Sequence, residues 1–280
     1  MDLLLFGVLA VSAYSFCNYQ NNKLQVTNLK VNLNNKEKIR ILQLSDLHSK
    51  EFGKNNKVLG EYIYKENPDI VVATGDLIDS NMKKIDEIVS FLGNINKDIP
   101  VFYIPGNNEM RCKKLNEILY KLRINKVNVL ENDIKTIKIK STIVNILGLA
   151  EKRIDEGELF YDKVNSKYKG EESDILLKKL EKMNGIKLVL SHYPENFEAN
   201  KEISYSRYKF DIMFSGHAHG GQFRLPFVGG LFAPGQGILP KYDSGMYGDK
   251  NKLVVSRGLG NSGFPLRLFN RPNIVLVEIL

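Results

Sequence analysis

The chain has 280 residues, of which 43% are hydrophobic and 26% are charged. This composition is typical of a packed globular protein and excludes a disordered chain, and the length suits one large α/β domain or two small ones. The formal net charge of +8 favours anionic partners such as phosphorylated substrates, nucleic acid or anionic lipid. The alternative is that lysines scattered among acidic residues make the chain basic without forming an anion site.

An apolar run at residues 3–17 lies near the start of the chain, and its 15 residues are fewer than the roughly 20 that a membrane span needs. The only charged side chain before it is Asp2, whereas a secretory signal begins with a basic region. We expect residues 1–22 to form an uncleaved membrane anchor or signal-like segment, and residues 23–280 to form the folded domain. A buried first helix is the alternative, and the side of the membrane is left open.

Hydrophobic periodicity after this segment predicts a partly alternating edge strand at residues 24–33. Buried strands and amphipathic helices then alternate, which indicates βαβ units and a largely parallel sheet. The predicted strands are 39–45, 70–74 and 100–104, and the predicted helices are 55–66, 83–94 and 113–123.

In the middle of the chain the alternation of strands and helices stops. Residues 134–140 and 142–149 predict a hairpin that continues this sheet in antiparallel fashion, and residues 150–172 predict a long surface loop. A helix follows at residues 173–183, with Ser173 as its N-cap. We expect two packed sheets with helices outside. The later predicted strands are 186–190, 211–214, 253–256 and 273–279.

Polar side chains follow the ends of five predicted strands, where open α/β sheets place their ligand sites. All four histidines of the chain lie in these turns, which makes coincidence improbable. The residues are Asp46, His48, Asp76, Asp79, Asn107, His192, His217 and His219.

Seven of these side chains predict a site for two divalent metal ions. Mixed nitrogen and oxygen donors without thiolate favour Mn, Fe, Zn or Co over Ca or Mg. A shared Asp76 carboxylate and a bridging hydroxide would offset the repulsion between two ions about 3.5–4 Å apart, and the ions would polarise the phosphoryl oxygens. The expected ligands are Asp46, His48, Asp76 and His219 for one ion, and Asp76, Asn107, His192 and His217 for the other.

The order and spacing of these motifs resemble those of the calcineurin-like metallophosphoesterases. The resemblance covers about residues 39–280, and it implies a four-layer α/β sandwich of two packed mixed sheets with flanking helices. It also implies hydrolysis of a phosphodiester or phosphomonoester by attack of a metal-bridging hydroxide. The tail, with Gly220-Gly221-Gln222 and Ser256-Arg257-Gly258, is similar to the small bacterial membrane- or wall-associated phosphodiesterases of that family. In that pattern Asp79 supports the catalytic site without being a ligand.

Asn108 departs from the family pattern, which usually has a histidine at this point. An asparagine can hydrogen-bond a phosphoryl oxygen but cannot act as a general acid, and loss of such an acid typically costs on the order of 10²–10⁴ in rate. The alternative function is therefore a catalytically weak metal-binding protein that recognises a phosphorylated ligand or partner. The complete ligand set argues against this alternative.

Three arginines are candidate phosphate clamps, because a planar guanidinium suits bidentate contact with phosphate. Surface salt bridges are the alternative for each of Arg257, Arg267 and Arg271. Gly220, directly after His219, would let a substrate approach the backbone closely. No cluster of aromatic and basic residues indicates a nucleic-acid platform. We expect a monomer at the cell membrane that acts on a phosphorylated substrate.

Overall fold

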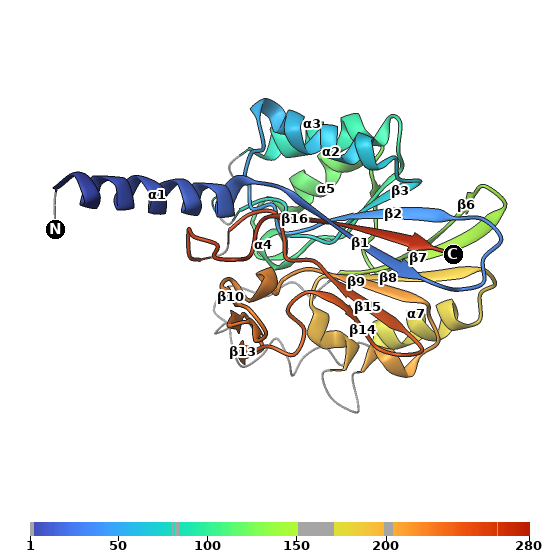
Figure 1. Ribbon diagram of the computed structural model, residues 1–280. Helices are drawn as coiled ribbons and strands as arrows, with labels where there is room; N and C mark the ends of the chain where they lie inside the picture. Colours follow the sequence, from blue (N-terminus) through green and yellow to red (C-terminus); the bar gives the residue numbers. More distant parts are fainter. Residues whose placement is uncertain (1–2, 80, 82–83, 151–170, 199–203, 262) are drawn as a thin grey trace.

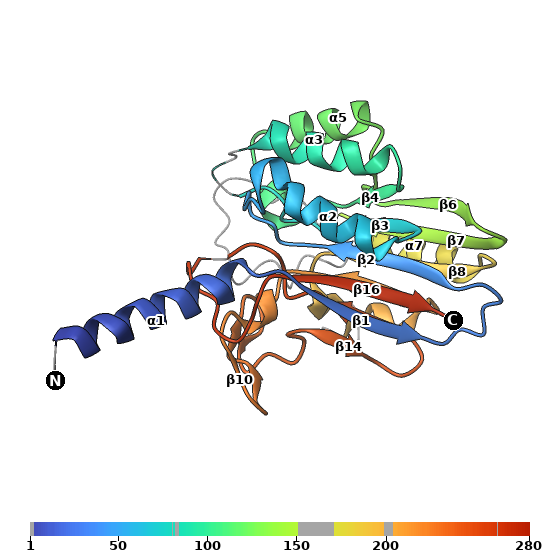
Figure 2. The same ribbon diagram turned by 45° about the horizontal axis from the view of Figure 1, so that its top comes forward.

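The protein is a sandwich of two six-stranded mixed sheets packed face to face, with helices on the outer faces (Figures 1 and 2). The structure is a computed structural model that describes residues 3–79, 81, 84–150, 171–198, 204–261 and 263–280. The four layers and the mixed sheets confirm the predicted fold. Most of the predicted surface loop, residues 151–170, lies outside the described residues.

The first sheet has the strand order β1-β16-β2-β3-β4-β5. Strand β16 is parallel to β1 and antiparallel to β2, whereas β2, β3, β4 and β5 are parallel to one another. Its outer face is covered by the helices that connect the parallel strands (Figure 2). The strands are β1 (Gln25–Val31), β2 (Ile39–Leu44), β3 (Ile70–Ala73), β4 (Val101–Tyr103), β5 (Asn128–Val129) and β16 (Asn273–Ile279). The helices are α2 (Lys57–Glu66), α3 (Ile85–Asn96) and α5 (Leu115–Ile124).

The second sheet has the strand order β14-β15-β9-β8-β7-β6. The predicted hairpin is present as β6 and β7, but it starts this second sheet and does not continue the first, because β7 pairs with β8. Helix α7 (Glu171–Glu181) begins two residues before Ser173, so the predicted N-cap is wrong. The strands are β6 (Asp133–Ile139), β7 (Thr142–Leu149), β8 (Ile186–Ser191), β9 (Ile212–Ser215), β14 (Gly245–Tyr247) and β15 (Lys252–Val255).

Apolar side chains from both sheets fill the space between them. Val72 and Phe102 of the first sheet and Leu188 and Phe214 of the second belong to one fully buried cluster. Because the central strands are covered on both faces, β3, β4 and β9 are apolar at nearly every position and do not alternate. This packing brings the carboxyl ends of the parallel strands of the two sheets to the same end of the sandwich.

Two short hairpins follow β9 and lie at that end of the sandwich (Figure 1). The first pairs β10 (Arg224–Leu225) with β11 (Gly229–Gly230), and the second pairs β12 (Phe232–Ala233) with β13 (Gly237–Ile238). The short helices of the described residues are η1 (Lys54–Asn56), α4 (Asn107–Met110), η2 (Pro194–Phe197), η3 (Tyr205–Arg207) and η4 (His219–Gly221).

Helix α1 (Leu3–Asn22) projects away from the sandwich (Figure 1), and its described apolar side chains are mostly exposed, so the alternative of a buried first helix is wrong. Its last turns contact the folded body. Asn21 donates to the Pro265 carbonyl at 3.0 Å, and the Phe16 ring lies 5.7 Å from the Phe269 ring. Among the described residues, no helix combines the length and the apolar character needed to cross a bilayer.

Candidate metal centre

The turns after five strands bring all seven predicted ligand residues together. Strands β2, β3 and β4 supply residues from the first sheet, and β8 and β9 supply residues from the second. The backbone N–H of His217 donates to both carboxylate oxygens of Asp46, at 3.0 and 3.2 Å, which joins the two sheets at this point. The candidate metal centre therefore lies across the seam between the sheets.

One ligand group consists of Asp46, His48 and His219, whose donor atoms all lie within 4.8 Å of one another. The Nε2 atoms of the two histidines are 3.0 Å apart, and His219 Nε2 lies 3.5 Å from Asp46 Oδ1. His48 Nε2 also lies 3.8 Å from Asp76 Oδ2. The four side chains expected to share one ion are therefore neighbours.

A second ligand group consists of Asp46, Asp76 and His192, again with donor atoms within 4.8 Å of one another. His192 Nε2 lies 3.6 Å from Asp76 Oδ2 and 3.1 Å from Asn107 Oδ1. The His217 ring is centred 5.1 Å from the His192 ring. Asp76 Oδ2 is thus near a histidine of each group, as a shared ligand requires. Asp46 also reaches this second group, which the sequence did not predict.

The protonation states of these groups suit a cation. Burial, together with neighbouring positive groups, holds the pKa of His217 and His219 well below the usual range, so both imidazoles are neutral at pH 7. Burial opposes ionisation of Asp76, but His192, His48 and the Asn108 N–H outweigh it and hold its pKa below the usual range. His192 Nδ1 lies 2.7 Å from the Thr74 carbonyl, so it carries the proton and Nε2 keeps the lone pair that a metal needs. Neutral imidazole nitrogens and carboxylate oxygens fit a divalent transition metal.

Five of the seven predicted ligand residues have a left-handed backbone conformation. A positive φ is uncommon outside glycine, and such residues cluster at functional sites where the surrounding structure holds them. Here the turns after β2 and β3 support each other, since the N–H of Asp46 donates to the Gly75 carbonyl and the N–H of His48 donates to the Asp76 carbonyl. The five residues are Asp46, His48, Asp76, His217 and His219, with φ between 47° and 65°.

Glu109 is fully buried and holds two of these turns together. Its Oε1 accepts hydrogen bonds from the N–H groups of Leu77 and Ile78, at 2.8 and 3.0 Å. Its Oε2 accepts from the N–H groups of Asp76 and Gly106, at 2.9 and 3.0 Å. Burial and the nearby Asp76 carboxylate raise the pKa of Glu109 to about 7. The sequence did not reveal this role, because the partners are backbone groups.

Two glycines permit the close approach of the strand ends. A Cβ atom at Gly106 would lie 2.3 Å from Asp76 Oδ1, so any side chain there would displace the carboxylate. Gly220 has a φ of 62°, and a Cβ atom there would lie 2.3 Å from Asn270 Oδ1. The packing of Asn270, whose amide donates to the His219 carbonyl at 2.7 Å, therefore requires glycine at position 220.

Asn108 and Asp79 lie beside the ligands. The Asn108 amide is 2.9 Å from His48 Nδ1, and its backbone N–H donates to Asp76 Oδ1 at 2.8 Å. The backbone N–H of Asp79 donates to Ser49 Oγ at 3.0 Å, and Ser49 Oγ lies 3.2 Å from Asp79 Oδ1. Asp79 thus braces the turn that carries His48.

The three candidate phosphate clamps have different environments. Arg267 is fully buried and donates to the backbone carbonyls of Arg257, Gly260 and Asn270, so its prediction as a phosphate clamp is wrong. Arg271 donates to the Tyr19 hydroxyl of α1 at 2.8 Å. Arg257 remains a candidate, since its side chain lies beside Gly220, next to the ligand His219.

Two further charged residues near His217 were missed. Arg111 follows α4 and contributes to the lowered pKa of His217. A Cβ atom at Gly235 would lie 3.3 Å from Glu195 Oε1 and 3.9 Å from His217 Nε2, which places Glu195 beside the metal centre. Burial raises the pKa of Glu195 to about 7. Neither residue belongs to a motif that sequence alone would single out.

A two-sheet α/β sandwich with carboxylates and histidines gathered at its seam defines a metal-dependent phosphoesterase. Comparison with protein families leads to the same class of protein. Residues 39–221 match the family model of the calcineurin-like phosphoesterases, and the chain belongs to this family. It is therefore a hydrolase of phosphoesters that depends on divalent metal.

Relatives support the same assignment. A metallophosphoesterase of Aquifex aeolicus is 30% identical over 86% of this chain and 85% of its own length. A metallophosphoesterase of Campylobacter jejuni is 30% identical over 100% of this chain and 69% of its own length. The phosphodiesterase YaeI of Escherichia coli is 35% identical, over only 34% of this chain and 32% of its own length.

Proposed function

We propose that the protein is a phosphodiesterase with two divalent metal ions. The observation that carries this proposal is the position of Asp76, whose Oδ2 lies 3.8 Å from His48 Nε2 in one direction and 3.6 Å from His192 Nε2 in the other. One ion would be held by Asp46, His48, Asp76 and His219, and the other by Asp76, Asn107, His192 and His217. Mn, Fe, Zn and Co suit this donor set.

The bound ions would supply Lewis acidity and lower the pKa of a coordinated water. The chain itself orients the ligands through Glu109, Asp79 and the Thr74 carbonyl. Two positive side chains border the ligands, Arg257 beside Gly220 and Arg111 near His217, and we expect them to contact phosphoryl oxygens. The partial likeness to phosphodiesterase YaeI supports a diester substrate.

Asn108 supports a second candidate function, that of a weak or inactive enzyme which binds a phosphorylated ligand. Its amide lies 2.9 Å from His48 Nδ1. If the amide oxygen faces that nitrogen, it accepts the Nδ1 proton and leaves Nε2 of His48 free for a metal. Asn108 then positions a ligand but supplies no proton to a leaving group.

The chain is further proposed to act as a monomer that associates with a membrane through α1. All seven proposed ligands come from one chain, so the site needs no second subunit. The exposed apolar side chains of α1 support contact with lipid. The side of the membrane stays open.

Metal content and turnover test the proposed function together. Purified protein loaded with Mn²⁺ is expected to hold two ions per chain and to hydrolyse bis(p-nitrophenyl) phosphate faster than p-nitrophenyl phosphate. Removal of metal with EDTA should abolish both reactions, and added Mn²⁺ should restore them. Two bound ions without turnover of either ester would favour the second candidate, and one ion or none would contradict the dinuclear centre.

A further inference from the structure

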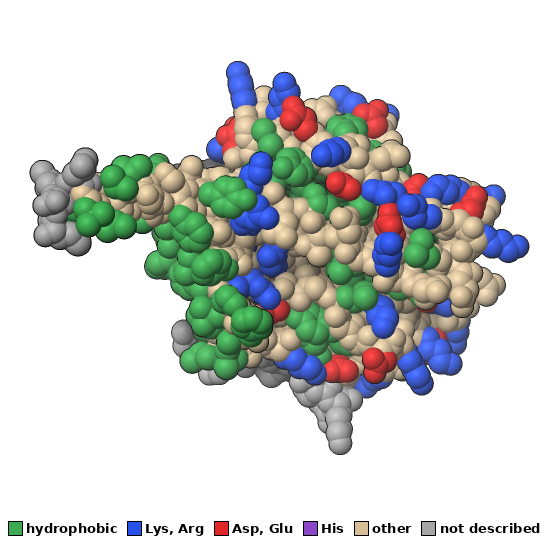
Figure 3. Space-filling model, viewed as in Figure 1, with side chains coloured by type: hydrophobic (Ala, Val, Ile, Leu, Met, Phe, Trp, Pro, Cys, Tyr) green, Lys and Arg blue, Asp and Glu red, His purple; other side chains and the backbone are tan. Residues whose placement is uncertain are grey.

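A continuous apolar surface extends from α1, across the loop before β16, to the β10–β13 hairpins (Figure 3). Its hairpin part, the apolar rim, consists of Phe227, Val228, Phe232, Ile238 and Leu239, all exposed. Phe227 is fully exposed, and Ile238 is 81% exposed. A large exposed apolar surface is uncommon on soluble monomers and marks an interaction site.

Helix α1 and the rim are connected through the loop at residues 264–271. Phe16 of α1 packs against Phe269, with ring centroids 5.7 Å apart, and Phe223 packs against Phe264 at 5.4 Å. The described apolar side chains of α1 are exposed around the helix, and a helix that is apolar all round is normally buried in protein or in lipid. The loop therefore contacts α1 on one side and Phe223, directly before β10, on the other.

Three exposed apolar residues of this surface also have an unfavourable backbone conformation, which adds to the cost of their exposure. Phe227, Leu239 and Phe269 have φ values of 65°, 53° and 51°, which are unfavourable for bulky side chains. Within the described part of the chain, these three are all of the apolar residues with positive φ, and all are exposed on this surface. Glycine or asparagine would relieve both costs at these turns, so the bulky apolar residues point to a binding role.

The rim borders the metal centre directly. The Leu231 N–H donates to the Gly221 carbonyl at 3.2 Å, which ties the hairpins to the helical turn that carries His219. The turn between β12 and β13 contains Gly235, whose Cβ position would lie 3.9 Å from His217 Nε2. A ligand that contacts the rim is therefore next to the metal ligands.

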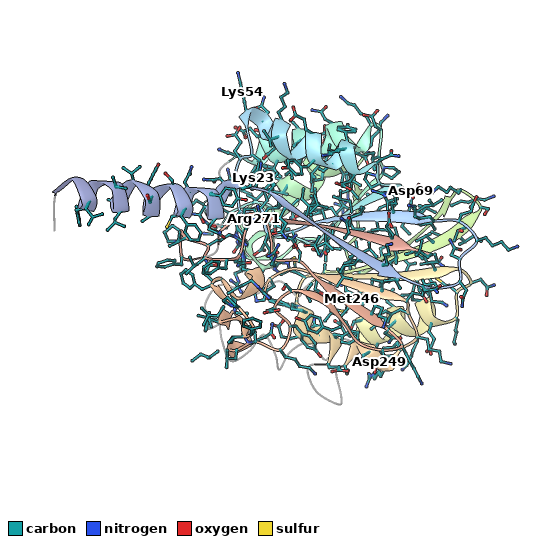
Figure 4. The ribbon with its side chains drawn as sticks, viewed as in Figure 1. Lys23, Lys54, Asp69, Met246, Asp249 and Arg271 are labelled. Carbon is teal, nitrogen blue, oxygen red and sulfur yellow. The ribbon has the colours of Figure 1, made fainter. Side chains whose placement is uncertain are left out.

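Charge favours an anionic occupant. The chain carries a formal net charge of +8, and Lys and Arg side chains border the apolar surface (Figure 3). Lys23 and Arg271 lie where α1 meets the folded body (Figure 4). Basic side chains next to exposed aromatic and aliphatic ones are typical of proteins that rest on anionic bilayers.

We infer that α1 and the apolar rim insert together into the interfacial region of an anionic lipid bilayer, which brings the metal centre to phosphoesters at the membrane surface. The substrate part of this inference rests on the proposed phosphodiesterase function. The contact of α1 with the membrane extends the association proposed above, and the contact of the apolar rim is new and depends on residues outside the ligand set. The expected substrate class is a phosphoester that carries an acyl or isoprenoid chain.

Flotation of the full chain with phosphatidylcholine vesicles that contain phosphatidylglycerol tests the contact. The double variant Phe227→Ser/Ile238→Ser should weaken vesicle binding by at least about tenfold, because two large apolar side chains no longer enter the lipid. The matched control is Ile124→Ser/Ile175→Ser, at positions 60% and 64% exposed on α5 and α7. It should bind as the wild type does. Hydrolysis of soluble bis(p-nitrophenyl) phosphate should stay within about twofold in both variants.

Vesicle binding that is lost in the rim variant and kept in the control supports the inference, whether or not the protein turns over a soluble diester. Three outcomes overturn it: a wild type that does not float, a rim variant that floats like the wild type, or a wild-type dimer that the rim variant converts to a monomer without binding vesicles. Failure to hydrolyse the soluble diester, with vesicle binding intact, would instead count against the proposed enzymatic function.

Discussion

Glu109→Gln is expected to destabilise the fold although the two side chains have nearly the same shape. Each carboxylate oxygen of Glu109 accepts hydrogen bonds from two backbone N–H groups. In the variant an NH₂ group replaces one oxygen, so two of the four N–H groups face a donor and lose their acceptor.

The magnitude follows from the type of bond. A hydrogen bond to a charged acceptor contributes about 1.5–3 kcal/mol, so the loss of two corresponds to about 3–6 kcal/mol. The neutral amide is easier to bury than a carboxylate whose pKa is raised to about 7, which offsets part of this cost. We expect a net loss of about 2–4 kcal/mol in the free energy of unfolding, or a fall of roughly 3–7 °C in Tm.

Urea unfolding followed by circular dichroism in EDTA measures this effect without a contribution from bound metal. The matched control is Glu61→Gln on the exposed face of α2, which should change stability by less than about 0.5 kcal/mol. A Glu109→Gln variant as stable as this control would refute the view that the buried carboxylate holds the turns after β3 and β4.

Three further changes test the site. Asp76→Asn removes the charge of the carboxylate that lies near a histidine of each ligand group, so bound metal should fall and hydrolysis of bis(p-nitrophenyl) phosphate should drop at least about a hundredfold. The exposed Asp249→Asn should change neither, and wild-type values for Asp76→Asn would contradict the ligand assignment. Asn108→His restores an acid, so it should flatten the dependence of rate on leaving-group pKa and speed alkyl ester hydrolysis about tenfold or more. Equal slopes in the wild type and the variant would show that residue 108 does not limit protonation of the leaving group. The pKa values of His217 and His219 are lowered, so both stay neutral as the pH falls from 7 to 6, and their ring signals in NMR spectra of the metal-free protein should not shift over that range. A ring signal of either residue that titrates near pH 6.5 would contradict the lowered pKa.

The strands and their polar ends were predictable because local periodicity determines them. Residues 70–73 are apolar throughout and residues 39–44 are apolar at four of six positions, and the Asp and His residues that follow fall at the expected edge of the sheet. The order of the strands within the two sheets was harder to predict from the sequence. The sequence of residues 134–149 does not determine which sheet the hairpin joins, because an apolar hairpin side can pack equally well in either of the two sheets.

Residues whose partners are mainly backbone groups were also beyond sequence reasoning. Arg267 cannot be told from Arg257 by residue type, yet it is fully buried, donates to backbone carbonyls and to Asn261 Oδ1, and lies 3.4 Å from His219 Nδ1. Glu109 likewise accepts hydrogen bonds from four backbone N–H groups. Such partners depend on tertiary placement of the main chain, which residue type does not encode.

The position of β16 determines when the first sheet can close during protein synthesis. Strands β1 and β2 leave the ribosome long before β16, yet β16 lies between them and pairs with both. Until it arrives, β1 has no neighbour in this sheet and β2 has an unpaired apolar edge, a state that favours aggregation. The nascent chain is therefore expected to depend on chaperones that cover this edge, and the ligands that follow β2 cannot be fixed in place before the C-terminal strand has been translated.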